Sequence, residues 1–267
     1  MKPIRSGPVL LDLDERGVAS IRMNRPEAAN GMTVEFLQAL HTAFMTCHAD
    51  PDIRVVVLSG EGKHFSAGGD VKSFAAKGEA LPDYLREATA WLQMATAAMI
   101  QLPSPVIASV HGFAAGGGGL GLVCAADLVV AAESAKFFSG AVRVGMAPDA
   151  GATVTLTQLV GLRKAMHILL ANPTLTAKEA LEIGLVTEVV PDADLAGRVD
   201  ALAAELAASA PLALAATKRL VWGGIGATIH ERLPEEARTV AELSGTADSR
   251  EGLAAVLERR TPKFTGC

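Results

Sequence analysis

The stretch PVIASVHGFAAGGGGLGL, residues 105–122, joins a compact apolar run to four consecutive glycines. Val106 to Val110 is typical of a buried strand, and Pro103 and Pro105 end the helical pattern that precedes it. Glycines that lead into apolar residues place free backbone N–H groups at the start of a helix, where the helix dipole favours negative charge. The stretch therefore predicts a strand followed by a turn that suits an oxyanion.

On both sides of this stretch, short apolar runs alternate with helical patterns. Strands are expected at Val9–Leu13, Val18–Met23, Ile53–Leu58, Val106–Val110, Leu128–Ala132, Lys136–Phe138 and Val186–Val190. Helices are expected at Val34–Cys47 behind the cap Thr33, at Tyr84–Leu102, on both sides of Gly161, after the capping box Thr176–Glu179, and from Asp194 onward. This order predicts an α/β core with parallel strand pairings over residues 1–193 and a helical C-terminal region over residues 194–267.

Composition and charge narrow the class of protein. Half of the 267 residues are hydrophobic and a fifth are charged, so the chain can bury a substantial core. The net charge is −5 and the basic residues are scattered along the chain, which argues against nucleic acid as a partner. An anionic ligand would therefore need a local binding site.

The sequence offers no targeting or metal signal. Asp12, Asp14 and Glu15 interrupt the only early apolar run, and the longest uncharged apolar stretch, Phe113 to Ala126, is shorter than the ~18 residues of a membrane span. We therefore expect a cytoplasmic protein without a membrane partner. The cysteines, which are Cys47, Cys124 and Cys267, lack metal-ligand spacing and predict neither a disulfide framework nor a metal site.

Two further segments of small residues accompany the glycine run. Residues 64–72 follow the strand that ends near Leu58, and Gly68 and Gly69 there can present N–H groups without obstruction by a side chain. Residues 145–153 form a turn that contains Asp149 before a helical pattern. Taken alone, the first segment is typical of a strand-to-helix turn and Asp149 of a helix cap, so their function depends on the combination.

The glycine run also matches a dinucleotide-binding fingerprint. Gly116, Gly118 and Gly121 satisfy the spacing G-x-G-x-x-G after a strand. However, no convincing acidic residue follows about 20 residues later at the end of a second strand, where the fingerprint requires one, and Asp127 is too near. We therefore do not predict a nicotinamide or flavin cofactor.

In combination, the chain resembles the crotonase (enoyl-CoA hydratase/isomerase) family over nearly its whole length. The matching segments, in the family's order, are Asn24-Arg25-Pro26, residues 64–72, 105–127, 135–137, 145–151, 176–190 and Thr261-Pro262-Lys263-Phe264. The resemblance implies a spiral of ββα turns with two nearly perpendicular sheets. It also implies C-terminal helices that form a homotrimer, often paired into a hexamer, and an acyl-CoA thioester as substrate with no permanently bound cofactor.

The resemblance also implies roles for individual residues. Two backbone N–H groups should form the oxyanion hole, from Gly69 and from Gly118. Gly118 is selected when the chain is aligned with the family pattern from Asp127. Because the glycine run is one residue longer than usual, alignment from His111-Gly112 selects Gly117 instead. The residues expected around the coenzyme A moiety are Arg25, Ala28, Ala67, Gly68, Asp70 and Val71, with Lys263 and Phe264 near its nucleotide end, from the same or a neighbouring subunit.

Departures from the family pattern narrow the reaction. The two glutamates by which family hydratases activate water correspond to Gly121, or to Leu120 under the other alignment, and to Ala141, none of which moves a proton. Asp149 matches the acidic catalytic position of the isomerase and dehalogenase types.

We therefore expect an enoyl-CoA isomerase with Asp149 as acid and base, similar to the ring-epoxide and enoyl-CoA isomerases of phenylacetate and fatty-acid breakdown. A dehalogenase would also need a histidine on the helix at residues 84–102, which has none, and His111 is expected to be structural. A hydratase without the glutamate pair and a non-catalytic CoA-binding scaffold are the alternatives.

Overall fold

The computed structural model describes residues 2–267, which fold into two sheets with helices on both faces of the larger one. The strands are β1 Lys2–Arg5, β2 Val9–Leu13, β3 Val18–Met23, β4 Val55–Gly60, β5 Val106–Val110, β6 Phe113–Ala115, β7 Leu128–Ala132, β8 Lys136–Phe138, β9 Leu175–Thr176 and β10 Glu188–Val190. The α-helices are α1 Val34–Ala49, α2 Val71–Ala75, α3 Leu81–Gln101, α4 Leu122–Ala125, α5 Ala152–Val160, α6 Leu162–Met166, α7 Ala177–Glu182, α8 Leu195–Ala207, α9 Pro211–Gly224, α10 Ile229–Ser244 and α11 Ala247–Glu258.

Short helical turns complete the chain. The 3₁₀ turns are η1 Pro26–Ala28, η2 Gly78–Ala80, η4 Ala141–Val144 and η6 Asp192–Asp194, and the π-helical turns are η3 Gly117–Gly121 and η5 His167–Ala171.

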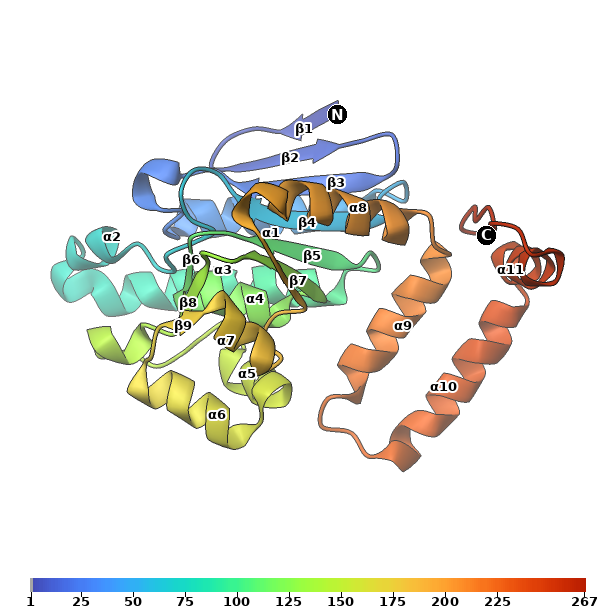
Figure 1. Ribbon diagram of the computed structural model, residues 1–267. Coiled ribbons are helices and arrows are strands. Elements are labelled where there is room, and N and C mark those ends of the chain that lie inside the picture. The colour runs from blue at the N-terminus through green and yellow to red at the C-terminus, as the bar shows by residue number, and fades with distance from the viewer. Residues whose placement is uncertain (1) are drawn as a thin grey trace.

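The larger sheet has seven strands in the order β1-β2-β3-β4-β5-β7-β10. β2 and β3 form the expected antiparallel hairpin, whereas β3, β4, β5, β7 and β10 run parallel. The crossover from β3 to β4 passes through α1, and the crossover from β4 to β5 passes through α3 (Figure 1). The predicted α/β core with parallel pairings and C-terminal helices is confirmed.

Alternation along the parallel strands builds a core on each face of this sheet. Ile21, Leu58 and Ala108 pack with residues of α1 and α3, while Val55 and Ile107 point to the opposite face and pack against α8. Figure 1 shows α8 across the front of the sheet and α1 behind it. Burial on both faces explains why these strands read as nearly continuous apolar runs in the sequence.

The smaller sheet has three strands in the order β6-β8-β9. β6 pairs in parallel with β8, and β8 pairs antiparallel with β9. The predicted capping box is present at the end of β9, because the Thr176 hydroxyl accepts a hydrogen bond from the Glu179 N–H and the Glu179 carboxylate accepts one from the Thr176 N–H. This sheet holds β6 and β8 beside the cavity described below.

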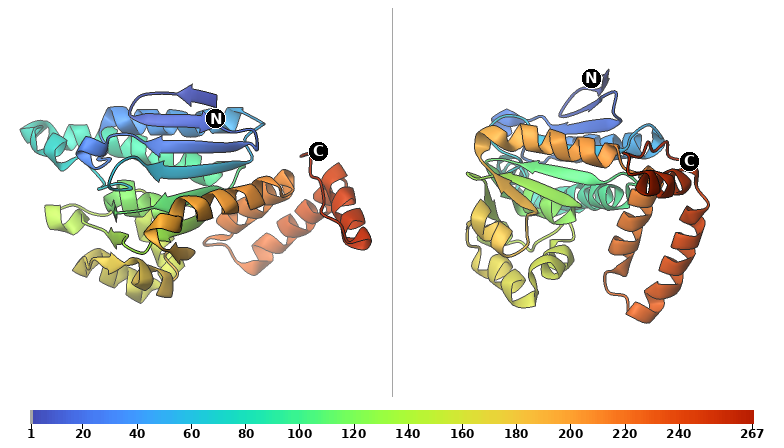
Figure 2. Two further views of the ribbon diagram at one scale, coloured as in Figure 1. Left: turned by 45° about the horizontal axis from the view of Figure 1, so that its top comes forward. Right: turned by 45° about the vertical axis from the view of Figure 1, so that its right-hand side comes forward.

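The last three helices extend away from this body. Figures 1 and 2 show α9 and α10 running side by side as an arm, with α11 and the C-terminus near its base. Apolar side chains on α10 and α11 are more than half exposed; they are Ile229, Leu233, Val240, Leu253, Val256 and Leu257. The division at residue 193 stays a prediction, and within the described chain α8 packs on the sheet before the arm begins.

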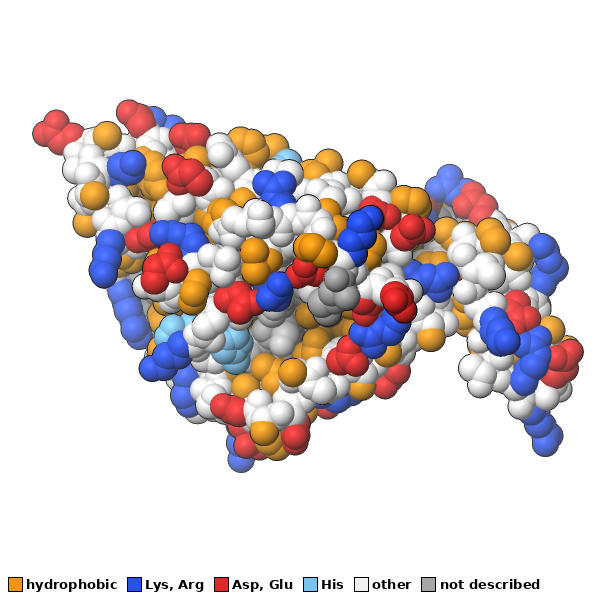
Figure 3. All heavy atoms as spheres, turned by 90° about the horizontal axis from the view of Figure 1, so that it is seen from above, with side chains coloured by type: hydrophobic (Ala, Val, Ile, Leu, Met, Phe, Trp, Pro, Cys, Tyr) orange, Lys and Arg blue, Asp and Glu red, His pale blue; other side chains and the backbone are white. Residues whose placement is uncertain are grey.

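On the face seen in Figure 3, acidic and basic side chains are interspersed. No single helix within residues 2–267 is long and apolar enough to cross a membrane, although residues 192–207 and 211–224 together pass that test as a pair bent by 105°. No group of three or more His, Cys, Asp or Glu side chains in the same range is placed to hold a metal ion.

Candidate active site

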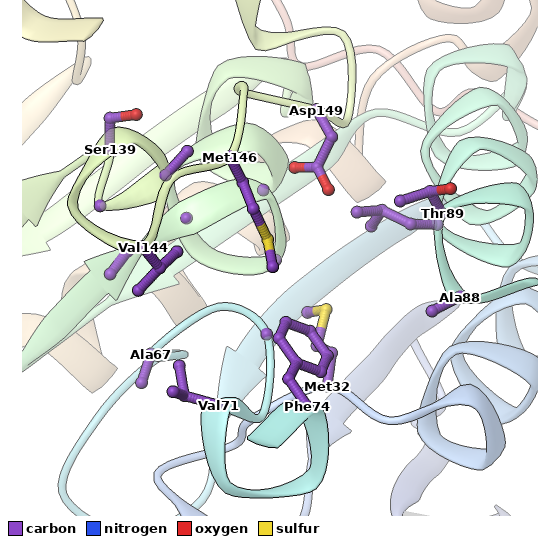
Figure 4. Close-up of a pocket in the computed structure, with 18 of the residues that line it drawn as sticks. Met32, Ala67, Val71, Phe74, Ala88, Thr89, Ser139, Val144, Met146 and Asp149 are labelled. Atoms are coloured by element: carbon purple, nitrogen blue, oxygen red, sulfur yellow. The ribbon is translucent and has the colours of Figure 1, made fainter. Parts of the chain in front are cut away.

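A cavity of about 440 Å³ lies where the three small-residue segments meet α1 and α3. The two glycine-containing segments contribute Ala67, Gly69, Val71 and residues 115–118, and the segment after β8 contributes residues 138–141, Arg143, Val144, Met146, Ala147 and Asp149. Met32 and Leu37, together with Phe74, Leu85, Ala88, Thr89 and Leu92, form the opposite wall. Figure 4 shows the labelled lining residues, among them Met32, Phe74 and Asp149, around one open space.

Backbone pairing holds the two glycine-containing segments together. Ser66 forms a parallel bridge with Ala114 of β6, in which the Ser66 N–H donates to the Phe113 carbonyl at 3.0 Å and the Ala115 N–H donates to the Ser66 carbonyl at 2.9 Å. Gly68 adopts φ +89°, and a β-carbon there would lie 2.7 Å from the Ala115 carbonyl oxygen. Small residues are therefore required for the segments to approach this closely.

The Gly69 amide is left free by this arrangement. Its neighbours bond to Met32, since the Met32 N–H donates to the Gly68 carbonyl at 2.8 Å and the Asp70 N–H donates to the Met32 carbonyl at 3.1 Å. Within residues 2–267 the Gly69 N–H has no acceptor. It is therefore available to a ligand in the cavity that Gly69 lines.

The additional glycine of the second segment is accommodated in a wide helical turn. Gly117–Gly121 forms one π turn that continues directly into α4. A π turn has one more residue in each hydrogen-bonded ring than an α turn, so it absorbs an insertion without disturbing the helix that follows. Gly117 and Gly118 both lie in its first turn, where the helix does not use the N–H groups, and both line the cavity.

Asp149 enters the cavity from the turn between η4 and α5. Ala150 and Gly151 adopt φ values of +53° and +74°, and the Ala152 N–H donates to the Asp149 carbonyl at 3.0 Å. Figure 4 shows the carboxylate pointing into the space between Met146 and Thr89. Loss of solvation on burial raises the pKa of Asp149 from its ordinary value, against a smaller opposing effect of its own backbone amide.

Asp149 is the only carboxylic acid among the described residues that line the cavity, and Arg143 is the only cation. The Arg143 guanidinium donates to the Asn172 carbonyl at 2.5 Å and lies over the Phe138 ring, 5.7 Å from its centroid. A raised carboxyl pKa in an apolar cavity is the setting in which an acidic side chain both accepts and returns a proton.

No glutamate occupies the two positions that correspond to the family's water-activating pair. Ala141 lines the cavity, whereas Gly121 does not, and a β-carbon on Gly121 would lie 2.6 Å from the Ala150 β-carbon. Leu120, the other alignment choice, is 1% exposed in the hydrophobic core.

Of the residues expected around coenzyme A, some line the cavity and others hold the first glycine-containing segment in place. Ala67 and Val71 line the cavity. Arg25 pairs with Asp70 at 3.1 Å and also bonds to the Gly31 carbonyl, while the Ala28 carbonyl accepts from the Gly31 N–H at 2.8 Å. Burial alone would raise the pKa of Asp70, but hydrogen bonds from Ser73 and Arg25 lower it overall. These contacts fix the edge of the first segment.

Lys263 and Phe264 do not line this cavity. The Lys263 N–H donates to Glu251 at 2.8 Å, and the Phe264 carbonyl accepts from Arg54 at 3.4 Å. The tail is thus tied to α11 and to the start of β4, and its contact with the nucleotide end of a ligand stays a prediction.

His111 and His64 have structural hydrogen bonds. His111 Nε2 bonds to the Gly62 carbonyl at 2.9 Å, and His64 Nδ1 accepts from the Phe113 N–H at 3.2 Å. Loss of solvation, with smaller effects of Lys63 and His111, lowers the pKa of His64, which favours the neutral form that can accept this bond. His64 thus joins the two glycine-containing segments, and His111 ties the second segment to the loop just before the first.

Several cavity residues could not be distinguished from core residues in the sequence. Met32, Leu37 and Leu92 belong to apolar patterns, and Phe74 follows the first glycine-containing segment. The helical periodicity of α3 indicates an apolar face, but it carries no signal for which part of that face meets the core and which part meets a ligand.

Comparisons with known proteins agree with this geometry. The sequence model described as "Enoyl-CoA hydratase/isomerase" matches residues 14–267. A probable enoyl-CoA hydratase of Rhodobacter capsulatus is 40% identical over 94% of this chain and 95% of its own length. The 1,2-epoxyphenylacetyl-CoA isomerase of Escherichia coli is 34% identical over 94% of this chain and 96% of its own length. The crystal structure of an enoyl-CoA hydratase of Mycobacterium smegmatis superimposes with a TM-score of 0.91 at 34% identity, covering 97% of this chain and 99% of that chain. The chain belongs to the enoyl-CoA hydratase/isomerase family, the crotonases.

Proposed function

We propose that the protein shifts a double bond in an enoyl-CoA ester, with Asp149 as the group that removes and returns the proton. The observation that carries this proposal is that Asp149 is the only carboxylic acid among the described residues lining the cavity, with a pKa raised by burial. Family membership supports an acyl-CoA substrate, and the apolar walls suit an acyl chain.

In this proposal the thioester oxygen accepts hydrogen bonds from the Gly69 N–H and from Gly118, or from Gly117 under the other alignment. Two fixed donors stabilise the enolate that forms when the α-carbon or the γ-carbon loses a proton, and one such donor contributes roughly 2.7–4 kcal/mol in comparable sites. The free amide of Gly69 and the first-turn position of both glycines support these roles.

The proton transfer uses a single carboxyl group. Ionised Asp149 takes a proton from one carbon of the acyl chain, and the electron pair moves onto the thioester oxygen as a dienolate. The protonated carboxyl then gives the proton to the carbon two positions away, which shifts the double bond and restores the carboxylate. Atoms and charge balance without water or a resident cofactor.

Assembly into a homotrimer, or a hexamer of two trimers, is part of the proposal, as is a cytoplasmic location. The exposed apolar side chains of α10 and α11 support an assembly in which the arm packs on a second copy of the chain. Sedimentation analysis at micromolar concentration should give three or six times the mass of one chain, and a monomer would contradict this part.

The experiment on the reaction follows double-bond migration and hydration separately, with trans-2-enoyl-CoA and 3-enoyl-CoA esters. Asp149→Asn should lower isomerisation by about 10²–10⁴-fold, the usual contribution of general acid–base catalysis, while binding of the ester is retained. Asp200→Asn, at an exposed aspartate paired with Arg16, is the control and should be fully active. Full activity of Asp149→Asn would remove Asp149 from the mechanism.

Hydration of a 2-enoyl-CoA is the second candidate, because the relative at 40% identity is named a probable hydratase. A 3-hydroxyacyl product formed without double-bond migration would establish it in place of isomerisation. Absence of both reactions, together with tight binding of CoA esters, would indicate the non-catalytic scaffold.

A further inference from the structure

Four glycines of the π turn have no backbone reason to be glycine. Gly117, Gly118, Gly119 and Gly121 all have ordinary negative φ values, unlike Gly116 before them at +60°. Alanine is the more favourable residue in a helical turn because it loses less backbone freedom on folding. The reason for each glycine must therefore lie in what its missing side chain would contact.

Those contacts differ along the turn. A β-carbon on Gly118 would overlap Met32, one on Gly119 would lie 2.5 Å from the Ser66 carbonyl oxygen, and one on Gly121 would meet Ala150. A β-carbon on Gly117 would overlap Oδ1 of Asp149 and lie 2.6 Å from its Cγ. Among these four glycines, only Gly117 faces an ionisable side chain.

We propose that Gly117 is a positioning residue for the reaction: the space left by its missing side chain is the recess that holds the Asp149 carboxylate at the cavity. This inference rests on the proposed function, because it concerns the placement of the same carboxyl group. The π turn contributes by accommodating the additional glycine, so that a residue without a side chain stands opposite Asp149 while α4 continues undisturbed.

Nothing else among the described residues fixes the carboxylate laterally. No donor other than its own backbone amide affects its pKa, and the one other charged side chain that lines the cavity, Arg143, bonds to the Asn172 carbonyl. The clash at Gly117 involves the free end of a side chain rather than backbone. An added methyl group is therefore expected to leave the fold intact and to push the carboxylate out of its recess.

The test is Gly117→Ala, compared with Gly197→Ala on α8, where a β-carbon would have no atom within 4 Å. Gly117→Ala should lower kcat for isomerisation by about 100-fold, the usual effect of misplacing a catalytic group by about 1 Å. Its Tm should be no lower than that of the wild type, since alanine is more favourable than glycine in a helical turn. Its binding of CoA esters should match the wild type, and Gly197→Ala should be fully active.

Two further measurements separate positioning from a purely structural role. In the double variant Gly117→Ala/Asp149→Asn, activity should equal that of Asp149→Asn alone, because both changes act through one carboxyl group. In the pH–rate profile of Gly117→Ala, activity should also be lost on acidification at a lower pH than in the wild type. A displaced carboxylate regains water, which reverses the effect of burial on its pKa.

Wild-type activity of Gly117→Ala beside an inactive Asp149→Asn would overturn this inference and leave the proposed function standing. The inference would also be overturned if the double variant were less active than Asp149→Asn alone, and Gly117→Ala had a lower Tm and the same pH dependence of activity as the wild type. Full activity of Asp149→Asn would instead remove the proposed function and this inference together.

Discussion

Replacement of Lys218 by methionine should destabilise the protein more than any change at an exposed charge. The Lys218 ammonium lies 2.7 Å from Asp127 Oδ2 and donates to the carbonyls of Met99 and Ser104 at 3.1 and 3.2 Å. Its side chain is 6% exposed. Loss of solvation lowers the pKa of Lys218 although the Asp127 carboxylate opposes this effect. Methionine keeps the apolar stem and removes the ammonium charge with its hydrogen-bond donors.

The contacts of Asp127 set the loss of unfolding free energy that we expect for Lys218→Met. Breaking a buried ion pair by removing one partner destabilises by about 3–5 kcal/mol, because the other charge is left without compensation. Asp127 would keep two donors, the Trp222 indole N–H and the Val106 N–H, both at 2.7 Å. We therefore expect the lower end, about 3 kcal/mol, which lowers Tm by about 6–12 °C in a chain of this size.

Thermal unfolding at neutral pH and one fixed protein concentration checks this value, since assembly makes Tm depend on concentration. The matched control is Lys178→Met on α7, where the lysine lies 3.9 Å from Glu182 and is 85% exposed. Such a surface pair contributes about 0.3–0.5 kcal/mol. A Tm for Lys218→Met equal to that of this control would refute the assignment of a compensated buried charge.

Two further predictions concern Asp149 and the π turn. Because the folded-state pKa of Asp149 is raised, its favourable contribution to stability is present below the unfolded-state pKa and is lost as pH rises through the folded-state pKa. Asp149→Asn should thus have a higher Tm than the wild type at neutral pH, with a difference that shrinks on acidification, and a lower Tm at neutral pH would contradict this. Gly121→Glu should not create a hydratase, because the added β-carbon meets Ala150. The variant should be less stable than the wild type by about 1–3 kcal/mol. Hydration of a 2-enoyl-CoA by a variant of wild-type stability would show instead that the turn can place a carboxylate there.

β5 and β7 were predictable because burial on both faces leaves a strong apolar signal, whereas β2 and β3 were predictable from the alternation of apolar and polar residues. β2, β3, β5, β7 and β8 have the bounds expected from the sequence. β1 was missed because three of its four residues are exposed at the sheet edge. β6 was missed because its three residues lie inside the glycine-rich stretch between Gly112 and Gly116, and β9 was missed because it has only two residues.

The candidate site was predictable in its parts and unpredictable in its arrangement. The sequence identified the small-residue segments and Asp149, and a count of glycines showed one residue more than the family pattern. A count cannot show where the helix absorbs an insertion, so the choice between Gly117 and Gly118 stayed open. The contacts of Met32 with Gly118 and of Asp149 with Gly117 involve residues more than 30 positions away in the sequence, which no local pattern contains.

The glycine turn explains why local preference fails at this point of the chain. Four helical glycines at 117–119 and 121 destabilise the turn relative to alanine by roughly 2–4 kcal/mol in total, at about 0.5–1 kcal/mol each. A conflict of this size between local propensity and fold is expected where function requires it. Three of the four absent side chains make room for packing, against Met32, Ser66 and Ala150, and the fourth makes room for the carboxylate of Asp149. The same glycines that bring backbone amides to the cavity thus also admit the Asp149 carboxylate, so the two parts of the proposed chemistry depend on a single turn.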